Sequence, residues 1–420
     1  MGVYTRYLIR QHVWRIVVAA GLVLAIIMPI HVGAYVDDTW RAAAGQGRSG
    51  LAETAVFVGL RAADVLAQIF PIAFVLAVLW SEMSLSLSGR RLMTRVAGRS
   101  LAAGLPALFI VAGGSVVTQF LLDNYARPHS VLSLVERQLG TYRQYVANET
   151  GAHGAWLAVG DDILQAGSFD RTAHAFGKVT LYRFAADRTL REVLVAERAF
   201  PQARDGGFAW ILEDGFRADI TEPGQAEPEA GAPEQPKRHV TRFASQAVDL
   251  AIDPLWVQFR GFKPMYLPLS DLARLARLTA IPADQPDYLT ALHLRFSKAL
   301  VPGLVCVLVI ATFLVGSARQ STPVAAGIGL AAAYLGIIAS GAVGVLGQGR
   351  YVSGPVAAWL SPLLLLVLCA FVVSKLLRMS AMPDPATLPR AGQQPAARPG
   401  TAAAAAGSDP AAARPLESAP

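Results

Sequence analysis

Residues 84–100 read SLSLSGRRLMTRVAGRS and separate two long apolar runs, one that ends at Trp80 and one that begins near Leu101. The stretch contains Arg90, Arg91, Arg95 and Arg99. An apolar run of about twenty residues is long enough to cross a bilayer as a helix. The chain therefore leaves an apolar environment for one short basic segment and returns to it, which is typical of two consecutive membrane spans.

Six apolar runs of this kind occur in the sequence. They lie at roughly 16–36, 54–80, 101–122, 299–317, 323–347 and 356–377. The composition agrees, since 53% of the 420 residues are hydrophobic and 16% are charged, below the usual share of charged residues in soluble domains. The first run is longer than the apolar core of a signal peptide and lacks a small-residue cleavage site, so we expect it to be retained. The sequence predicts an integral membrane protein.

Lysine and arginine gather at one set of span ends. Outside residues 84–100, these basic residues are Arg6, Arg10, Arg15, Arg319, Lys375 and Arg378. Short cytoplasmic loops carry an excess of such residues, so we expect these ends, and both termini, in the cytoplasm. The formal net charge of +7 reflects this asymmetry and is not a nucleic-acid signal. Residues 124–295 follow an odd number of spans and are expected outside.

The external region has the pattern of a β domain. KVTLYRFAADRTLREVLVAERAF (178–200) and GFAWILEDGFRADI (207–220) alternate apolar and polar residues between Gly and Asp turns. Several short strands at this spacing favour a sandwich or a jelly roll. The Pro/Glu/Gly-rich residues 221–237 predict a loop at one end of it. Both cysteines, Cys306 and Cys369, lie in apolar runs, so we expect the domain to fold without disulfides.

The predicted fold is a membrane α-helical protein with an inserted all-β domain. Residues 1–123 hold transmembrane helices 1–3, with residues 81–100 as a cytoplasmic segment. Residues 124–295 form a periplasmic, jelly-roll-like β domain between helices 3 and 4, and residues 296–378 hold helices 4–6. Residues 379–420 are rich in Ala and Pro, which predicts a disordered cytoplasmic tail.

No enzyme motif is present in the sequence. It lacks a G-x-x-x-x-G-K-[ST] phosphate loop, a G-x-S-x-G elbow and an H-E-x-x-H pair, and its seven histidines show no metal-ligand spacing. We therefore expect no catalytic residues, no metal and no cofactor. Any ATP-driven activity of this chain requires a separate ATPase subunit.

Five stretches together resemble one family, the lipopolysaccharide export permeases of the LptF/LptG type. They are TRYLIRQ (5–11), QIFPIAFVLAVLW (68–80), RVAGRS (95–100), NYARPHS (124–130) and FSKALVPGLVCVLVIATFLVGSARQ (296–320). In order and spacing they cover roughly residues 4–378. The first external loop, YVDDTWRAAAGQGRSG (35–50), is more similar to the LptG-type subunit than to the LptF type. The sequence departs from the family at Arg90, where members usually carry a glutamate.

The resemblance implies a permease subunit of an ATP-driven (ABC-type) transporter in the inner membrane of a Gram-negative bacterium. Such a subunit extracts lipopolysaccharide from that membrane and passes it to a periplasmic bridge. The implied partners are a homologous six-span permease subunit, a cytoplasmic ATPase dimer and a membrane-anchored periplasmic jelly-roll protein. The alternative is a non-transporting, membrane-anchored scaffold whose β domain binds a partner in the cell envelope.

The basic segment after span two has two interpretations. From the residues alone, its arginines orient the protein and touch phospholipid headgroups. The resemblance instead implies a short helix that docks on the ATPase through an apolar strip. The candidate coupling residues are Arg90, Arg91, Leu92, Met93, Arg95, Val96 and Gly98.

Three external arginines are candidates for contact with the anionic headgroup of lipopolysaccharide. Arg41 and Arg48 follow span one and match the basic cluster of the family. Arg61 lies near the external end of span two, one helical turn from Asp64. It either binds phosphates or acidic sugars of lipid A, or it pairs with Asp64 at the membrane surface.

Small residues recur at four-residue spacing in span five, at Gly336, Ser340 and Gly344. Such spacing lets a neighbouring helix approach closely. The neighbour is either another helix of this chain or, as the resemblance implies, the partner subunit at a lateral gate.

Overall fold

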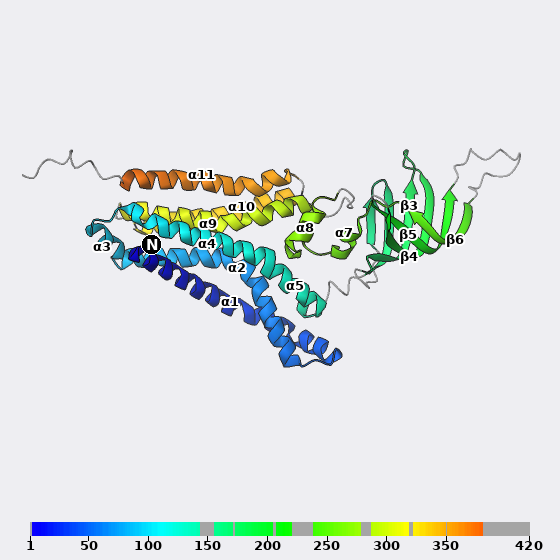
Figure 1. Ribbon diagram of the computed structural model, residues 1–420, viewed down its shortest axis with the longest axis horizontal. Coiled ribbons are helices and arrows are strands. Elements are labelled where there is room, and N and C mark those ends of the chain that lie inside the picture. The colour runs from blue at the N-terminus through cyan, green and yellow to red at the C-terminus, as the bar shows by residue number, and fades with distance from the viewer. Residues whose placement is uncertain are drawn as a thin grey trace, which may run out of the picture.

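The computed structural model describes residues 2–142, 155–170, 173–204, 207–220, 238–278, 287–318, 322–349 and 351–380. A bundle of long helices is joined, end to end, to an antiparallel sheet (Figure 1). The short helix α3 (Arg90–Val96) lies at the opposite end of the bundle from the sheet. We call these two ends the α3 end and the sheet end. The expected loop at 221–237 and almost all of the expected tail lie outside the described residues.

Six helical segments are long and apolar enough to cross a membrane, which confirms the six predicted spans. They are α1 (Val3–Gly45), α2 (Gly50–Leu87), α4 (Leu105–Leu121) with its continuation, α9 (Tyr288–Ala318), α10 (Thr322–Gln348) and α11 (Gly354–Ser380). The 3-10 turn η1 (Leu101–Gly104) leads into α4, which continues through the π-helical turn η2 (Leu122–Ala126) into α5 (Arg127–Glu136). A 3-10 turn, η3 (Gly140–Tyr142), follows α5.

The first two helices are longer than a membrane requires. They contain 43 and 38 residues, and at about 1.5 Å per residue each exceeds the roughly 30 Å hydrocarbon core. They meet at the sheet end in a tight helical hairpin, where a Cβ atom at Gly50 would lie 2.7 Å from the Trp40 ring. A side chain at position 50 would therefore have to displace the Trp40 ring. Residues expected to form an external loop are instead mostly helical.

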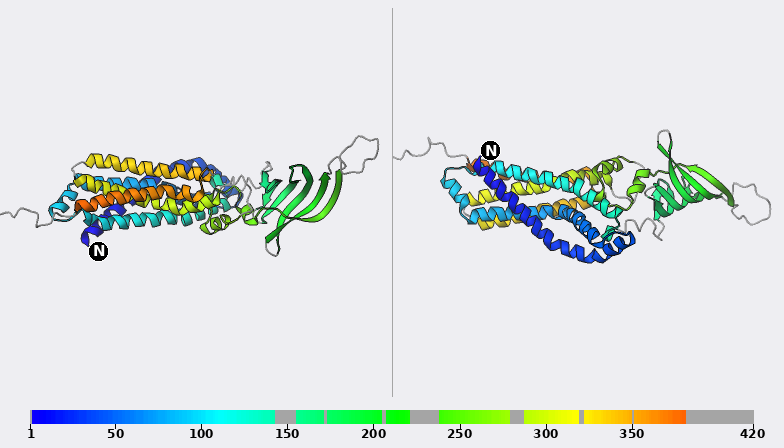
Figure 2. Two further views of the ribbon diagram at one scale, coloured as in Figure 1. Left: turned by 90° about the horizontal axis from the view of Figure 1, so that it is seen from above. Right: turned by 60° about the horizontal axis from the view of Figure 1, so that its bottom comes forward.

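The inserted region is one curved sheet of six strands in sequence order (Figure 2). The strands are β1 (Ala155–Val159), β2 (Asp162–Asp170), β3 (Ala175–Phe184), β4 (Leu190–Arg204), β5 (Gly207–Ile220) and β6 (Arg238–Val248). All neighbouring pairs are antiparallel. The predicted β insertion between helices 3 and 4 is confirmed. Its described strands form a meander, whereas a jelly roll interleaves the strands of two sheets.

One face of the first four strands carries a buried apolar row. Leu157, Leu164, Leu181 and Leu194 form a row across four strands, and each is at most 1% exposed. The core continues into α7 (Pro254–Phe259), η4 (Pro264–Tyr266) and α8 (Leu269–Leu275), which lead from the sheet to α9. It also includes Phe57 of α2 and Leu134 of α5. The sheet is thus packed onto the bundle by a continuous apolar core.

Candidate functional site

The α3 helix presents an apolar surface at its end of the bundle. Leu92, Met93 and Val96 are 62%, 74% and 82% exposed. Residues three and four apart share one helix face, so these side chains form a strip on the outside of the molecule. Exposed apolar groups beside basic residues are typical of a protein-docking surface. The structure thus supports the predicted apolar strip.

Arg91 points the opposite way and is buried. Its guanidinium donates to Glu82 Oε2, and Glu82 is fully buried near the end of α2. Arg91 therefore neither faces the lipid nor lies on the exposed surface of α3. Arg90 donates to the hydroxyl of Tyr7, and Gly98 (φ 76°) lies in the turn after α3. The side chain of Arg95 lies outside the described part of the chain.

The same carboxylate also binds helix α1. His12 Nε2 lies 3.1 Å from Glu82 Oε1, and His12 Nδ1 lies 2.8 Å from the carbonyl oxygen of Leu8. The His12 ring thus connects Glu82 of α2 to the backbone of α1. We call His12, Glu82 and Arg91 the buried triad.

A second buried carboxylate organises the sheet end. Asp64 is fully buried and accepts hydrogen bonds from Arg61 at 2.5 Å, Gln68 at 3.1 Å and Arg127 at 3.1 Å. The Tyr142 hydroxyl also donates to Asp64, at 2.7 Å. Burial, and next the Asp64 carboxylate, raise the pKa of the Tyr142 phenol, so it remains a neutral donor. Four elements, α2, α5, η3 and α1, meet here, because Arg61 also reaches His31 Nδ1 at 3.3 Å.

The structure therefore favours the pairing interpretation of Arg61. Its guanidinium contacts Asp64, Tyr142 and His31 and is not among the residues that line the neighbouring cavity. Arg61 thus holds this end of α2 against η3 and α1.

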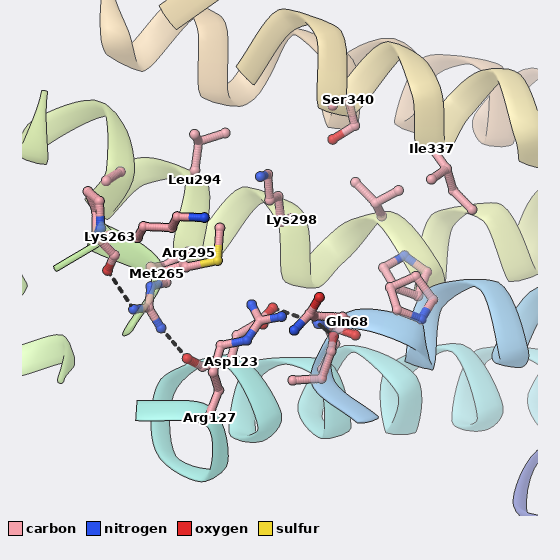
Figure 3. A pocket seen from close by; sticks show the side chains of 18 of the residues that line it. Gln68, Asp123, Arg127, Lys263, Met265, Leu294, Arg295, Lys298, Ile337 and Ser340 are labelled. Carbon is pink, nitrogen blue, oxygen red and sulfur yellow. Dashed lines mark hydrogen bonds and ion pairs between the residues drawn. The ribbon is translucent and has the colours of Figure 1, made fainter. Parts of the chain in front are cut away.

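A cavity of about 460 Å³ lies beside this network, between α2, η2, α9 and α10 (Figure 3). Its lining holds four cations, which are Arg127, Lys263, Arg295 and Lys298, against one acid, Asp123. Arg127 is paired with both Asp123 and Asp64, each at 3.1 Å. The cavity is therefore positively charged, although it lies in an apolar bundle.

Arg295 and Lys298 lie one turn apart on α9 and differ in their partners. Arg295 donates to the backbone oxygens of Asp123, Pro264 at 2.9 Å and Leu267 at 2.8 Å. These acceptors are neutral, so its charge is not cancelled. Lys298 forms no ion pair or hydrogen bond with any residue that the structure describes, and its side chain is exposed to the cavity. Lys298, like Lys263 of the same lining, is therefore available to an anion.

The small residues of α10 pack mainly against helices of the same chain. A Cβ atom at Gly336 would lie 3.2 Å from Leu365 of α11, and one at Gly344 would lie 3.4 Å from Leu294 of α9. Ser340 lines the cavity. Packing within this bundle thus accounts for the spacing. Another face of α10, with Tyr334 and Leu335, is exposed and apolar.

Arg41 and Arg48 lie at the α1–α2 hairpin and do not line the cavity. Arg41 pairs with Asp38 at 3.2 Å and is largely exposed. Arg48 lies 3.3 Å from Glu53, which also binds Arg137 at 3.1 Å. The structure therefore does not bring the three candidate headgroup arginines together at one site.

Sequence reasoning missed Arg127, Arg295 and Lys298 as cavity residues. Arg127 and Lys298 lie in two of the stretches that resemble the family, 124–130 and 296–320. The available signal was a basic side chain within or beside an apolar run, because such residues usually face a cavity or the bundle interior.

Comparison with known proteins adds one match. The model of a family described as "Lipopolysaccharide export system permease LptF/LptG" matches residues 6–375. No curated protein matches the sequence. The match covers all six apolar helices and the inserted sheet, and therefore also α3 and the cavity.

Proposed function

Because the chain belongs to the LptF/LptG family of lipopolysaccharide export system permeases, we propose that its cavity receives the anionic headgroup of lipopolysaccharide. As a member of this family, the chain is a multi-pass membrane protein and a transport subunit without a catalytic domain. The observation that carries the proposal is Lys298, which faces a cavity inside the bundle and forms no ion pair or hydrogen bond with any residue that the structure describes.

The charges in the cavity favour a phosphate-bearing ligand. Arg127 is already neutralised by two carboxylates, whereas Arg295 and Lys298 retain net positive charge. An ammonium group binds phosphate oxygens through charge-assisted hydrogen bonds, which are stronger away from water. A ligand that enters with its phosphate at Lys298 therefore gives this side chain a direct anionic partner. The apolar lining around Ile337 and Val301 is suited to the carbon-rich parts of the same lipid.

We also propose that Arg41 makes an additional contact at the external hairpin. Its side chain is 74% exposed, and its single partner, Asp38, is itself 46% exposed. Surface pairs of this kind exchange readily with other anions, because they contribute little stability. Arg48 is less available, since Glu53 holds it together with Arg137.

Photo-crosslinking tests the cavity assignment. A photo-reactive amino acid at Ile337, which lines the cavity, is expected to crosslink lipopolysaccharide in membranes of cells that produce the complete transporter. Lys298→Gln should lower the yield about tenfold, the effect of losing one hydrogen bond to a charged group. Lys375→Gln, near the end of α11 and outside the cavity lining, is the matched control. An equal yield in all three proteins would contradict the proposal.

The proposed partners follow from the family and from two exposed surfaces. The α3 strip suits a cleft on a cytoplasmic ATPase dimer, and the exposed apolar faces of α1 and α10 suit a homologous six-span permease subunit. A periplasmic jelly-roll protein is proposed to receive the lipid at the far end of the sheet. This arrangement places the α3 end and both termini in the cytoplasm and the sheet in the periplasm of a Gram-negative bacterium.

We propose the LptG-type role for this chain within the pair. The support is its first external segment, residues 35–50. We also propose a division of the chain into four parts. Residues 1–123 and 296–378 hold the spans, residues 124–295 form the β domain and residues 379–420 form the tail.

A further inference from the structure

Helix α1 is attached to the bundle less extensively than the other spans. Only 6% of the residues in its most apolar window are buried, compared with 56% for α2 and 72% for α9. Its few buried side chains include Leu8 and His12 near the α3 end and Thr39 and Ala43 near the sheet end. Between these ends Met28 is buried and the other residues are exposed or half-buried, so polar contacts at the two ends contribute to how α1 follows its neighbours.

At the α3 end, the buried triad joins three elements through one carboxylate. Glu82 belongs to α2, His12 to α1 and Arg91 to α3, and Glu82 binds both of the others. Two further contacts connect the first turns of α1 with the α3 region. Arg90 donates to the Tyr7 hydroxyl, and the Arg99 guanidinium lies 5.0 Å from the centre of the Tyr4 ring.

The triad is difficult to separate because its charges are buried. A carboxylate without access to water is strongly destabilised when a partner is removed. Apolar side chains, in contrast, slide past one another without losing directional bonds. A displacement of α3 that leaves Glu82 paired must therefore also displace His12, and with it the start of α1.

The other end of α1 reaches the cavity network. His31 accepts from Arg61 at 3.3 Å, Arg61 binds Asp64, and Asp64 binds Arg127 in the cavity wall. A continuous series of contacts thus runs from α3 through the buried triad, along helix α1, which contains Pro29, to the cavity. Energetic coupling between distant sites requires a physical connection of this kind.

We propose that His12, Glu82 and Arg91 are positioning residues that make α1 move with α3, so that movement of a docked ATPase reaches the cavity. The proposal rests on the docking of α3 on an ATPase and adds the residues that carry the movement onward. None of the three touches the transported lipid in this arrangement.

Two substitutions of His12 separate coupling from stability. In glutamine, the side-chain nitrogen lies about as far along the chain as His12 Nε2, so His12→Gln retains a donor to Glu82. In asparagine, the side-chain nitrogen lies about as far along the chain as His12 Nδ1. His12→Asn therefore retains the hydrogen bond to the Leu8 carbonyl oxygen and loses the one to Glu82. The two variants are similar in polarity and bury no new charge.

The test uses the complete complex, with partner subunit and ATPase, in proteoliposomes. In His12→Asn, ATP hydrolysis should continue while lipopolysaccharide transported per ATP falls about tenfold, as expected when one hydrogen bond to a charged group is lost. His12→Gln should retain most of the lipopolysaccharide transported per ATP. Equal ratios in the two variants, or a proportional loss of hydrolysis and transport in His12→Asn, would overturn the proposal.

A distance measurement detects the movement itself. Spin labels at Val17 in α1 and Val367 in α11 are both exposed on the outside of the bundle. Trapping the ATPase with vanadate should change their separation in the parent protein and in His12→Gln, but not in His12→Asn. An equal change in His12→Asn would refute the triad while leaving docking intact. If docking itself were wrong, a variant with a charge on the α3 strip would still retain an active ATPase.

Discussion

At the scale of single residues, Asp64 forms more hydrogen bonds at the sheet end than the candidates predicted there from the sequence, which are Arg41, Arg48 and Arg61. Its carboxylate is fully buried and accepts hydrogen bonds from Arg61, Gln68, Arg127 and Tyr142. The sequence placed Arg61 beside Asp64 because the two lie one helical turn apart. It could not place Arg127 or Tyr142 there, since those contacts depend on how α2 packs against α5.

Asp64→Ala is expected to destabilise the protein by about 3–5 kcal/mol, because the buried Arg127 and the half-buried Arg61 lose their shared counter-ion. Thermal unfolding of the purified protein in detergent measures the change. Asp38→Ala is the control, since its pair with Arg41 is mostly exposed and such pairs contribute about 1 kcal/mol or less. Equal unfolding temperatures for the two variants would show that the Asp64 network is not a stabilising centre.

At the scale of elements, α3 illustrates both what the sequence predicts and what it does not. Seven residues with apolar side chains three and four apart predict a short helix with an apolar strip, and the structure has both. The inward direction of Arg91 was not predictable, because its partner Glu82 lies on the preceding helix. The long helices were predictable from local hydropathy. The helical hairpin at Gly50 and the π-helical turn η2 were not, since tertiary packing determines them.

The valine at position 96 tests the strip. Val96→Asp places a carboxylate in a proposed apolar contact, and burial of an unpaired charge is strongly unfavourable. We expect the variant to insert normally and to lose most of the co-purifying ATPase. Val240→Asp makes the same change at another exposed valine, in β6 at the opposite end of the molecule, and should keep the ATPase. Full retention in Val96→Asp would mean that the strip is not a docking surface.

At the scale of the whole molecule, the cavity depends on residues from distant parts of the sequence. Arg127 follows the third span and Lys298 lies in the fourth, with the whole β domain between them. The order of three spans, a β insertion and three spans could be predicted because hydropathy and alternation are local patterns. The charged cavity could not, because it exists only when α2, η2, α9 and α10 come together.

The same two valines report the orientation of the protein. Single cysteines at Val96 and Val240 can be labelled selectively, because Cys306 and Cys369 are both buried. In intact spheroplasts, a membrane-impermeant maleimide should label Val240→Cys and not Val96→Cys, and both should react after permeabilisation. The reverse pattern would place the sheet in the cytoplasm and would exclude the proposed orientation.

The most direct test of the central claim is ATP-driven release of lipopolysaccharide from proteoliposomes that contain this chain, its partner subunit and the ATPase. Transfer to a soluble periplasmic acceptor should require both ATP and this chain. Lys298→Gln should slow transfer about tenfold, through loss of one charge-assisted contact, while Lys375→Gln should not. Transfer that proceeds equally without ATP, or equally fast with Lys298→Gln, would contradict the assignment of the cavity as the site of lipid transport.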